Sequence, residues 1–253
     1  MEILNNKTID IVTLTHNRMQ FAAATIWSII NYTDYPYRLI VVDNGSTDGT
    51  KEWLINMKEM GFIHELILND KNLGIAQAKN QGMELVNWDC GYAILTDSDI
   101  VLPLTEPSWI RLMFESMVRH PNLGMLSCDL DPVNHNPATH TWWYKQREHK
   151  KEDVDLIITG FHMTIIPKDI FNKIKEENNG EAFWGDSLYG EVDAHYRESV
   201  QKMGRWVGVQ RQVSAIHLGW MDKRFFNEYD IMKRRERFKA EVERRKREGG
   251  TGT

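Results

Sequence analysis

The chain has 253 residues, a length at which a single domain with a sizeable buried core is ordinary. Its hydrophobic content of 42% and charged content of 26% are typical of soluble globular proteins. The net charge of −5 argues against a protein whose whole surface binds nucleic acid. The two cysteines, Cys90 and Cys128, indicate a reducing compartment without a disulfide framework, although a single bridge stays open.

No targeting or membrane-spanning segment is expected from the sequence. The first residues lack a basic region followed by an apolar run, so no signal peptide is predicted. No window approaches the apolar length needed to span a bilayer. We therefore predict a cytoplasmic protein and exclude a membrane-embedded synthase, while attachment to a membrane surface stays open.

The first half of the chain alternates short apolar runs with helical patterns. Strands are predicted at 9–14, 38–42, 65–68 and 92–96, and helices over 21–30, 53–60 and about 75–86. Strands separated by helices of this length imply a parallel sheet covered on both faces. Ligands of such sheets bind beyond the carboxyl ends of the strands, so the polar residues that follow each strand are the candidates for function.

The second half has a less regular pattern. A helix is predicted over 108–118, a strand at 124–128, a strand pair or bent strand over 157–166, a helix opened by Pro167, a helix over 189–203 and a strand at 212–216. The polar stretch 131–153 is a long loop, and loops of this length inside a compact domain are usually functional or mobile. From residue 228 onward the chain is helical in propensity and dense in Lys and Arg.

Two carboxylates, Asp97 and Asp99, follow the strand predicted at 92–96. Oxygen ligands of this kind suit Mg²⁺ or Mn²⁺, which also bind substrate diphosphates. The motif is short, however, and an Asp-x-Asp turn whose carboxylates cap the next backbone amides is an equally sound interpretation. Taken alone, the motif favours the turn.

The residues after the second strand divide into a functional and a structural group. Ser46 or Asp48 is a suitable N-cap for the following helix. Asp43 is the first residue past an apolar strand, which is a poor site for an unpaired carboxylate. It can accept hydrogen bonds from a nucleobase or a ribose. We therefore predict a functional Asp43 and a structural Asp48.

The helix near residue 75 carries small residues at every fourth position. Gly74, Ala78 and Gly82 predict a flat face against the sheet, which explains why a glycine is tolerated inside the helix. Lys79 is placed on another face, where it can reach a diphosphate or, as is more usual for a single helical lysine, remain solvated.

Four segments in this order resemble the signatures of the family 2 glycosyltransferases. They are Thr15-His16-Asn17-Arg18, the turn from Asp43 to Asp48, the helix start from Asn72 to Gly82, and Asp97-Ser98-Asp99. The resemblance implies an α/β protein of the GT-A fold, with a Rossmann-like, mostly parallel central sheet flanked by helices and a less regular acceptor-side half. It divides the chain into one domain over 1–227, with a nucleotide-sugar half (1–102) and an acceptor half (103–227), and a basic tail over 228–253.

The resemblance also implies roles for individual residues. Thr15 and Asp43 are expected to contact the nucleoside, Asp97 the ribose or the metal, and Asp99 the metal that bridges the diphosphate. The remaining residues assigned to the nucleotide-sugar site are Asn17, Arg18, Asn44, Lys79, Ser98 and Gly160.

Three segments of the second half extend the match. The segment 158–163 resembles the one that lines the sugar and acceptor pocket in the family. The segment 189–197 resembles the helix start that carries the family's catalytic acid, which places the base on Glu191 and leaves Asp193 as the alternative. Asp193 can equally serve the helix dipole and pair with Arg197 at i, i+4, and we assign it that role. His217 follows the last strand, where some family members supply a histidine to the metal, and an imidazole favours Mn²⁺.

These observations predict an inverting, metal-dependent glycosyltransferase that uses Mn²⁺ or Mg²⁺. The donor is a UDP-, GDP- or dTDP-linked sugar, and the acceptor is a hydroxyl of a carbohydrate or glycolipid. A sugar nucleotidyltransferase is disfavoured because the segment after the first strand lacks glycines. A processive synthase is disfavoured because 201–206 has one residue too many for its Gln-x-x-Arg-Trp motif.

Two alternatives remain, a non-catalytic nucleotide-sugar binding module and a sugar transferase acting on modified nucleic acid. The basic tail is most simply a solvated helix, although it can also settle on an anionic membrane surface, where a lipid-linked acceptor resides. Contact of the tail with nucleic acid is the least favoured of these options.

Overall fold

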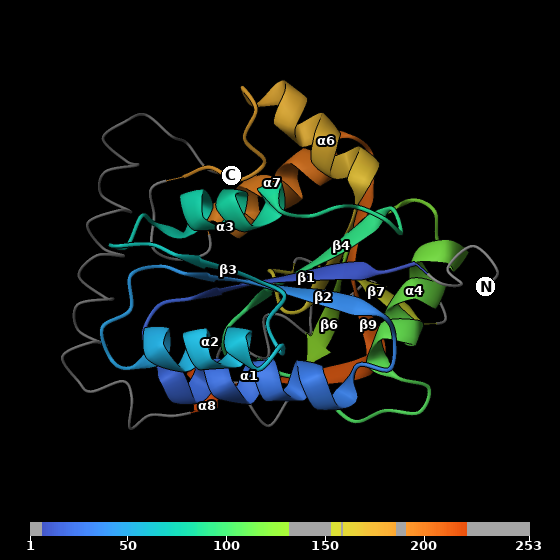
Figure 1. Ribbon diagram of the computed structural model, residues 1–253. Coiled ribbons are helices and arrows are strands. Elements are labelled where there is room, and N and C mark those ends of the chain that lie inside the picture. Colours follow the sequence, from blue (N-terminus) through green and yellow to red (C-terminus); the bar gives the residue numbers. More distant parts are fainter. Residues whose placement is uncertain (1–6, 132–152, 158, 186–190, 222–253) are drawn as a thin grey trace. The chain divides into compact units, whose positions relative to one another are not determined.

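The computed structural model describes residues 7–131, 153–157, 159–185 and 191–221 (Figure 1). The chain divides into two compact units, Met1–Leu218 and Gly219–Thr253. Only the first residues of the second unit are described, so the architecture below is that of the first unit. Most of the polar loop predicted over 131–153, the start of the helix predicted from 189, and the basic tail from 228 lie outside the described residues.

The first half of the chain forms the alternating strands and helices that the sequence predicts. In chain order these are β1 (Ile9–Thr15), α1 (Met19–Tyr32), β2 (Tyr37–Asp43), α2 (Thr50–Glu59), β3 (Glu65–Leu68), α3 (Ile75–Glu84) and β4 (Tyr92–Asp97). β1 pairs in parallel with both β2 and β4, and β2 pairs in parallel with β3. The prediction of a parallel sheet in this half is confirmed.

The second half adds strands of both directions to the same sheet. Its elements are β5 (Ile100–Val101), α4 (Trp109–Arg119), β6 (Leu123–Leu130), β7 (Val154–Leu156), β8 (Thr164–Pro167), α6 (Lys168–Glu177), α7 (Glu191–Lys202), β9 (Trp206–His217) and α8 (Leu218–Met221). β8 lies antiparallel between β4 and β6, while β9 is parallel to β6 and antiparallel to β5 and β7. The resulting order is β3-β2-β1-β4-β8-β6-β9-β5, with β7 beside β9.

The prediction of one strand pair or bent strand over 157–166 is wrong in detail. β7 ends at Leu156 and pairs with β9, whereas β8 begins at Thr164 and pairs with β4 and β6. The described residues between them form a non-strand connection in which Met163 has a φ of 54°. The last strand is also longer than predicted, because it begins at Trp206 rather than Gln212.

Helices cover both faces of the sheet, as the sequence predicts. Strand residues alternate between two hydrophobic cores, so that Ile11 and Val12 face opposite sides. One core joins the sheet to α1, α2 and α4, and the other joins it to α3, α6 and α7. Figure 1 shows α1 and α2 below the strands and α3, α6 and α7 above them. The carboxyl ends of β1, β2 and β4 are therefore held by a sheet that is buried on both sides.

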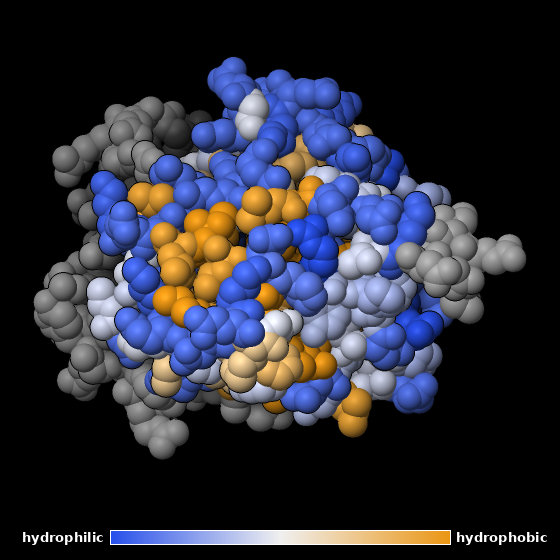
Figure 2. Space-filling model, in the orientation of Figure 1, coloured by the Kyte–Doolittle hydropathy of each residue, from blue (hydrophilic) through white to orange (hydrophobic). Residues whose placement is uncertain are grey.

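Strand β3 closes one side of the sheet. All four residues of β3 are half-buried. Figure 2 shows hydrophobic surface gathered on one face of the molecule, with hydrophilic residues around it. Glu65 begins the strand and the exposed Asp70 and Lys71 follow it. Charged residues at a sheet edge discourage pairing with another chain, so the sequence protects this edge at both ends.

Helix α3 packs against the sheet through Gly82. A Cβ atom added at this position would lie 2.6 Å from Cγ1 of Val12 and 3.1 Å from Cγ2 of Val42. The predicted close approach is therefore confirmed for Gly82. It is wrong for Gly74, where an added Cβ would meet nothing within 4 Å. Gly74 instead caps α3 with a φ of 89°, a conformation that glycine adopts without strain.

We expect the Gly82→Ala variant to lower the free energy of unfolding by up to about 2 kcal/mol. Overpacking against the stiff Val12 side chain costs about 1–3 kcal/mol, which exceeds the gain of about 1 kcal/mol from removing a helical glycine. Chemical denaturation measures the difference. Gln77→Ala, on the exposed side of the same helix, is the matched control and should stay within about 0.5 kcal/mol of the parent. A Gly82→Ala protein more stable than the parent would contradict the packing argument.

The described helices include none that is long and apolar enough to pass through a lipid bilayer.

Candidate functional site

The strand register brings the predicted site residues to one edge of the sheet. Thr15 at the end of β1 lies opposite Asp43 at the end of β2, and Leu14 lies opposite Asp97 at the end of β4. Three candidates from distant parts of the sequence therefore meet where the parallel strands end. This is the place at which an open α/β sheet binds its ligands.

Asp43 is fully buried and is satisfied by its own neighbours. Its Oδ1 accepts hydrogen bonds from Oγ1 of Thr15 at 3.0 Å and from Oγ of Ser46 at 2.5 Å, and its Oδ2 accepts one from the Ser46 backbone N–H at 3.0 Å. These three donors stabilise the buried carboxylate without a ligand, and the contact of Asp43 with a nucleoside stays a prediction. Asp43 fixes the positions of Thr15 and Ser46.

Asp48 has a structural role, as predicted, but the prediction that it or Ser46 is the N-cap of α2 is wrong. The N-cap residue of α2 is Gly49, with a φ of 93°, and Asp48 accepts hydrogen bonds from the backbone N–H and the hydroxyl of Thr50. Ser46 is no helix cap, since its hydroxyl oxygen accepts a hydrogen bond of 2.7 Å from the backbone N–H of Asn17. The turns after β1 and β2 are therefore tied to each other.

The Asn44 side chain makes four hydrogen bonds inside the protein, two as donor through its amide nitrogen and two as acceptor through its amide oxygen. Its Nδ2 donates to Asn72 Oδ1 at 2.9 Å and to the Gly74 carbonyl at 3.2 Å. Its Oδ1 accepts hydrogen bonds from the Leu73 N–H at 2.9 Å and from Asn69 Nδ2 at 3.3 Å. Direct contact with a nucleotide would require Asn44 to give up one of these bonds, so the geometry favours a role in holding the loop that precedes α3.

Asn17 and Arg18 form a strained corner between β1 and α1. Both have positive φ angles, 55° and 60°, which residues other than glycine seldom adopt. The Asn17 Oδ1 accepts a hydrogen bond of 2.8 Å from the Thr47 N–H, and this bond anchors the corner. The Arg18 side chain is 47% exposed, and its guanidinium lies 3.9 Å from Asp99 Oδ2. The corner thus presents one cation to the edge of the sheet.

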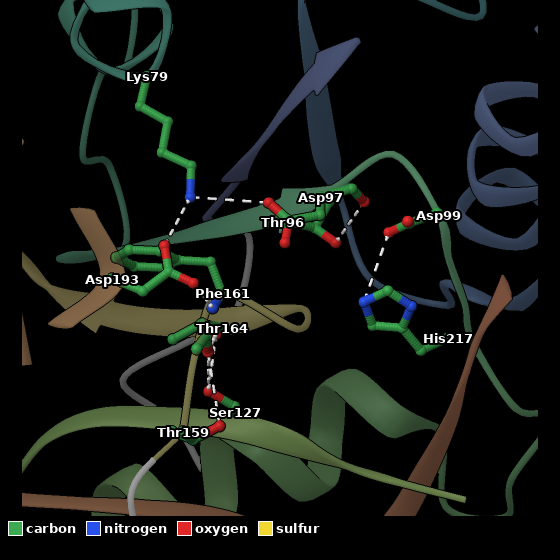
Figure 3. A network of polar contacts seen from close by, with 11 residues as sticks. Lys79, Thr96, Asp97, Asp99, Ser127, Thr159, Phe161, Thr164, Asp193 and His217 are labelled. Atoms are coloured by element: carbon green, nitrogen blue, oxygen red, sulfur yellow. Dashed lines mark hydrogen bonds and ion pairs between the residues drawn. The ribbon is translucent and has the colours of Figure 1, made fainter. Parts of the chain in front are cut away.

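Asp97, Ser98 and Asp99 form the turn from β4 into the short strand β5. β5 pairs with the end of β9, where Ile100 lies opposite His217, and the Leu218 N–H donates a 2.8 Å hydrogen bond to the Asp99 carbonyl. This pairing places His217 Nε2 3.8 Å from Asp99 Oδ1 (Figure 3). Ser98 is half-buried between the two carboxylates.

Burial favours the neutral form of His217, which is the form that binds metal ions. Burial lowers the pKa of His217 below its ordinary value, against the opposing effect of the Asp99 charge. A neutral imidazole and a carboxylate are both common ligands of Mn²⁺ and related ions. Opposite ligands on an octahedral ion with bonds of about 2.1 Å are about 4.2 Å apart and adjacent ones about 3.0 Å, so the observed separation needs only a small adjustment.

The donor atoms therefore fit a divalent cation, but they do not complete its coordination. Within the described ranges, no group of three or more His, Cys, Asp or Glu side chains is arranged to hold a metal ion. An ion bound through one or two protein ligands keeps positions for water and for substrate phosphates, as Mg²⁺ commonly does. Asp99 and His217 match such an incomplete set.

Lys79 occupies a position that the sequence interpretation missed. It is 1% exposed, and its ammonium lies 3.1 Å from Asp193 Oδ1, 3.6 Å from Asp97 Oδ1 and 4.1 Å from the centre of the Phe161 ring (Figure 3). The expectation of a solvated lysine is wrong. A signal was available in the sequence, because Lys79 precedes Gly82 and Met83 by three and four residues and so shares their buried face.

Asp97 is the most perturbed carboxylate at this edge. Burial raises its pKa, the Lys79 ammonium opposes that shift, and the charges of Asp193 and Asp99 add to it. The net direction is upward, although 37% of the side chain is exposed and water weakens each effect. A cation bound nearby would favour the charged form of Asp97.

Gly160 provides the space that Asp193 needs. A Cβ atom at Gly160 would lie 2.7 Å from Asp193 Oδ2, the oxygen that accepts a 3.3 Å hydrogen bond from the Phe161 N–H. The charge partner of Asp193 is Lys79 rather than Arg197, whose guanidinium donates to the Thr159 carbonyl at 3.5 Å. The predicted i, i+4 pair of Asp193 with Arg197 is therefore wrong, and the observed ion pair joins helices α3 and α7.

Glu191 begins α7, two residues before Asp193, and is half-buried. It packs against Gly185, where an added Cβ would come within 3.3 Å of Glu191 Cγ and of His195 Nδ1. The His195 ring stacks on Trp184 with centroids 5.3 Å apart. Glu191 thus stands beside an aromatic pair. Two residues along the same helix, the oxygens of Asp193 contact the Lys79 ammonium and the Phe161 N–H.

The mixed α/β arrangement, with helices on both faces of a central, mostly parallel sheet, matches the GT-A glycosyltransferase fold. Residues 10–175 match the family model described as glycosyl transferase family 2. The chain therefore belongs to glycosyl transferase family 2.

Solved structures agree with the fold at low sequence identity. The mannosyltransferase PcManGT from Pyrobaculum calidifontis, in complex with GDP-Man and Mn²⁺, superimposes with a TM-score of 0.61 at 18% identity, covering 85% of this chain and 58% of that one. GalNAc-T7 with UDP, GalNAc and Mn²⁺ gives a TM-score of 0.63 at 12% identity, covering 84% and 44%. Residues 1–349 of S. aureus TarS give 0.60 at 15% identity, covering 83% and 60%.

Two curated relatives match part of the chain. An uncharacterized glycosyltransferase of Haemophilus influenzae is 25% identical over 129 residues, which are 51% of this chain and 38% of the relative. The putative teichuronic acid biosynthesis glycosyltransferase TuaG of Bacillus subtilis is 25% identical over 91 residues, 36% of this chain and 35% of TuaG. The matched stretches span little more than a third of either relative.

Proposed function

We propose that this protein transfers a sugar from a nucleoside-diphosphate donor to an acceptor hydroxyl, with a divalent cation and with inversion at the anomeric carbon. The observation that carries the proposal is the pairing of Asp99 with a neutral His217 at the edge where β1, β2 and β4 end. Membership of glycosyl transferase family 2 supports it.

Asp99 and His217 would hold the cation, and Asp97 is a further candidate ligand. The ion would supply Lewis-acid stabilisation of the charge that develops on the departing diphosphate. Mn²⁺ suits the mixed oxygen and nitrogen ligands, and Mg²⁺ is the alternative. The occurrence of Mn²⁺ with GDP-Man in PcManGT, and with UDP and GalNAc in GalNAc-T7, is consistent with this assignment.

The nucleoside would lie over the ends of β1 and β2. Thr15 and Asp43 would lie beneath it, with Asp43 acting chiefly by orienting Thr15 and Ser46. The exposed guanidinium of Arg18, close to Asp99, is suited to neutralise a diphosphate there. Asn44 would shape the pocket through the loop before α3.

Glu191 is the proposed base that takes the proton from the acceptor hydroxyl. Its competitor Asp193 is bonded to the Lys79 ammonium through Oδ1 and to the Phe161 N–H through Oδ2. Protonation of Asp193 would remove the charge that pairs with the buried Lys79 ammonium. Direct attack of the activated hydroxyl opposite the leaving diphosphate inverts the anomeric centre.

A donor screen tests the proposed function. The protein is incubated with UDP-, GDP- and dTDP-sugars, with Mn²⁺, with Mg²⁺ or with EDTA, and the released nucleoside diphosphate is measured. We expect slow metal-dependent hydrolysis of one nucleotide class, faster once an acceptor sugar or glycolipid is added, and a product of inverted configuration by NMR. Binding of a nucleotide sugar without release would identify a binding module instead.

A further inference from the structure

The Lys79 ammonium connects four separate elements of the fold. The lysine comes from α3, Asp97 ends β4, Asp193 lies in the first turn of α7, and Phe161 belongs to the connection between β7 and β8. Figure 3 shows the ammonium pointing between the two carboxylates. These carboxylates come from the two halves of the chain, so one side chain joins the strand-end side of the site to α7.

The burial of Lys79 argues against direct contact with a diphosphate. Only 1% of its side chain is exposed, whereas Arg18 is 47% exposed and lies 3.9 Å from Asp99. A ligand at the edge of the sheet meets Arg18 before it can reach Lys79. The ammonium also has partners within the protein already, because two carboxylates and the face of an aromatic ring surround it.

A second connection runs parallel to the lysine. The Asp97 N–H donates a 3.2 Å hydrogen bond to the Phe161 carbonyl, and the Phe161 N–H donates to Asp193 Oδ2 at 3.3 Å. Backbone and side chain therefore fix the same pair of acids. The ammonium stabilises this geometry because its removal would leave two neighbouring carboxylates without a counter-charge.

We propose that Lys79 is a positioning residue that sets the distance between Asp97 and the first turn of α7, and so places Glu191 relative to the donor. The catalytic part of this inference rests on the proposed function. It differs from the role expected from the sequence, in which Lys79 binds the diphosphate. The positioning role and the diphosphate-binding role predict different losses of turnover and of nucleotide affinity when the Lys79 charge is removed.

The test uses Lys79→Met, Asp193→Asn and the double variant, with Lys175→Met as the matched control. Lys175 is a partly exposed lysine of α6 that pairs with Glu84 outside the site. We expect Lys79→Met to lower the unfolding midpoint by about 5 °C or more, and the double variant to fall by clearly less than the two single shifts added together. Lys175→Met should leave the midpoint and the activity unchanged.

Turnover and nucleotide binding separate positioning from ligand contact. With the donor identified by the screen, Lys79→Met should lower kcat about 30- to 100-fold, as expected when a catalytic group is misplaced by about 1 Å. The affinities for the nucleoside diphosphate and for the monophosphate, measured with Mn²⁺, should change equally and by less than about threefold. Selective loss of diphosphate affinity by a factor of about ten or more would overturn the proposal, and additive shifts in the unfolding midpoint would also overturn it.

Asp193→Asn keeps the proposal testable if Lys79→Met fails to fold. Its amide oxygen can still accept the Phe161 hydrogen bond, so only the charge contact is lost. We expect it to retain clearly more turnover than Glu191→Gln, and equal inactivity of the two variants would make Asp193 the base and overturn the positioning role. If the parent protein released no nucleotide at all, the proposed function would fail, while the midpoint comparison would still decide whether Lys79 bridges the two acids.

Discussion

Replacing Asp99 with alanine is expected to reduce Mn²⁺-dependent nucleotide release at least about a hundredfold, because stabilisation of the leaving group by a metal ion is worth several kcal/mol. Asp99 is the carboxylate that lies beside the neutral His217, and its other near neighbour is the Arg18 guanidinium. The variant should also lose affinity for Mn²⁺ alone, which calorimetry or Mn²⁺ electron paramagnetic resonance measures without any substrate.

The matched control is Asp70→Ala, an exposed acid beyond the end of β3. It should bind Mn²⁺ and release nucleotide as the parent does. Activity that survives the loss of Asp99 but remains sensitive to EDTA would move the cation to Asp97. Activity that is changed neither by the loss of Asp99 nor by EDTA would exclude a metal-dependent mechanism.

Replacing Glu191 with glutamine is expected to reduce sugar transfer about a thousandfold while donor binding stays within about threefold of the parent, because a positioned base contributes about 10² to 10⁴ to the rate. The substitution preserves size and hydrogen bonding but removes the proton acceptor. Steady-state kinetics with a saturating acceptor measure the loss. Fluorescence or calorimetric titration with the nucleoside diphosphate measures what remains of donor binding.

Glu198→Gln is the control for this variant, since Glu198 is exposed on the same helix. It should be fully active. Full activity of Glu191→Gln as well would assign the base to Asp193. That outcome would require Asp193 to lose its charge beside the buried Lys79 ammonium during the reaction.

The first half of the fold could be predicted from the sequence because its signals are local. Each apolar run is followed by a helical pattern, and β1, β2, β3 and β4 lie where the runs are. Parallel pairing then places Thr15, Asp43 and Asp97 at one edge without further information. The approach of His217 to Asp99 was expected only through the family resemblance, because the antiparallel pairing of β5 with β9 joins residues far apart in the sequence.

The rest of the fold and of the candidate site depends on contacts between residues far apart in the sequence. The periodicity of apolar residues carries no information about such contacts. β8 enters the sheet between β4 and β6 in the opposite direction, which an apolar run near residue 164 does not reveal. The burial of Lys79 depends on two carboxylates from other elements, and the satisfaction of Asp43 depends on hydroxyls from Thr15 and Ser46. In each case a charged residue was interpreted without the partners that make its position stable.

The position of His217 at the end of β9 has a consequence for how the protein matures. A ribosome releases Asp99 long before His217, and the strands β1 to β4 can pair while the later part of the chain is still being made. Asp99 gains its histidine only when β9 has docked beside β5 and β6. The strand ends that carry Thr15, Asp43 and Asp97 can therefore assemble before Asp99 and His217 come together.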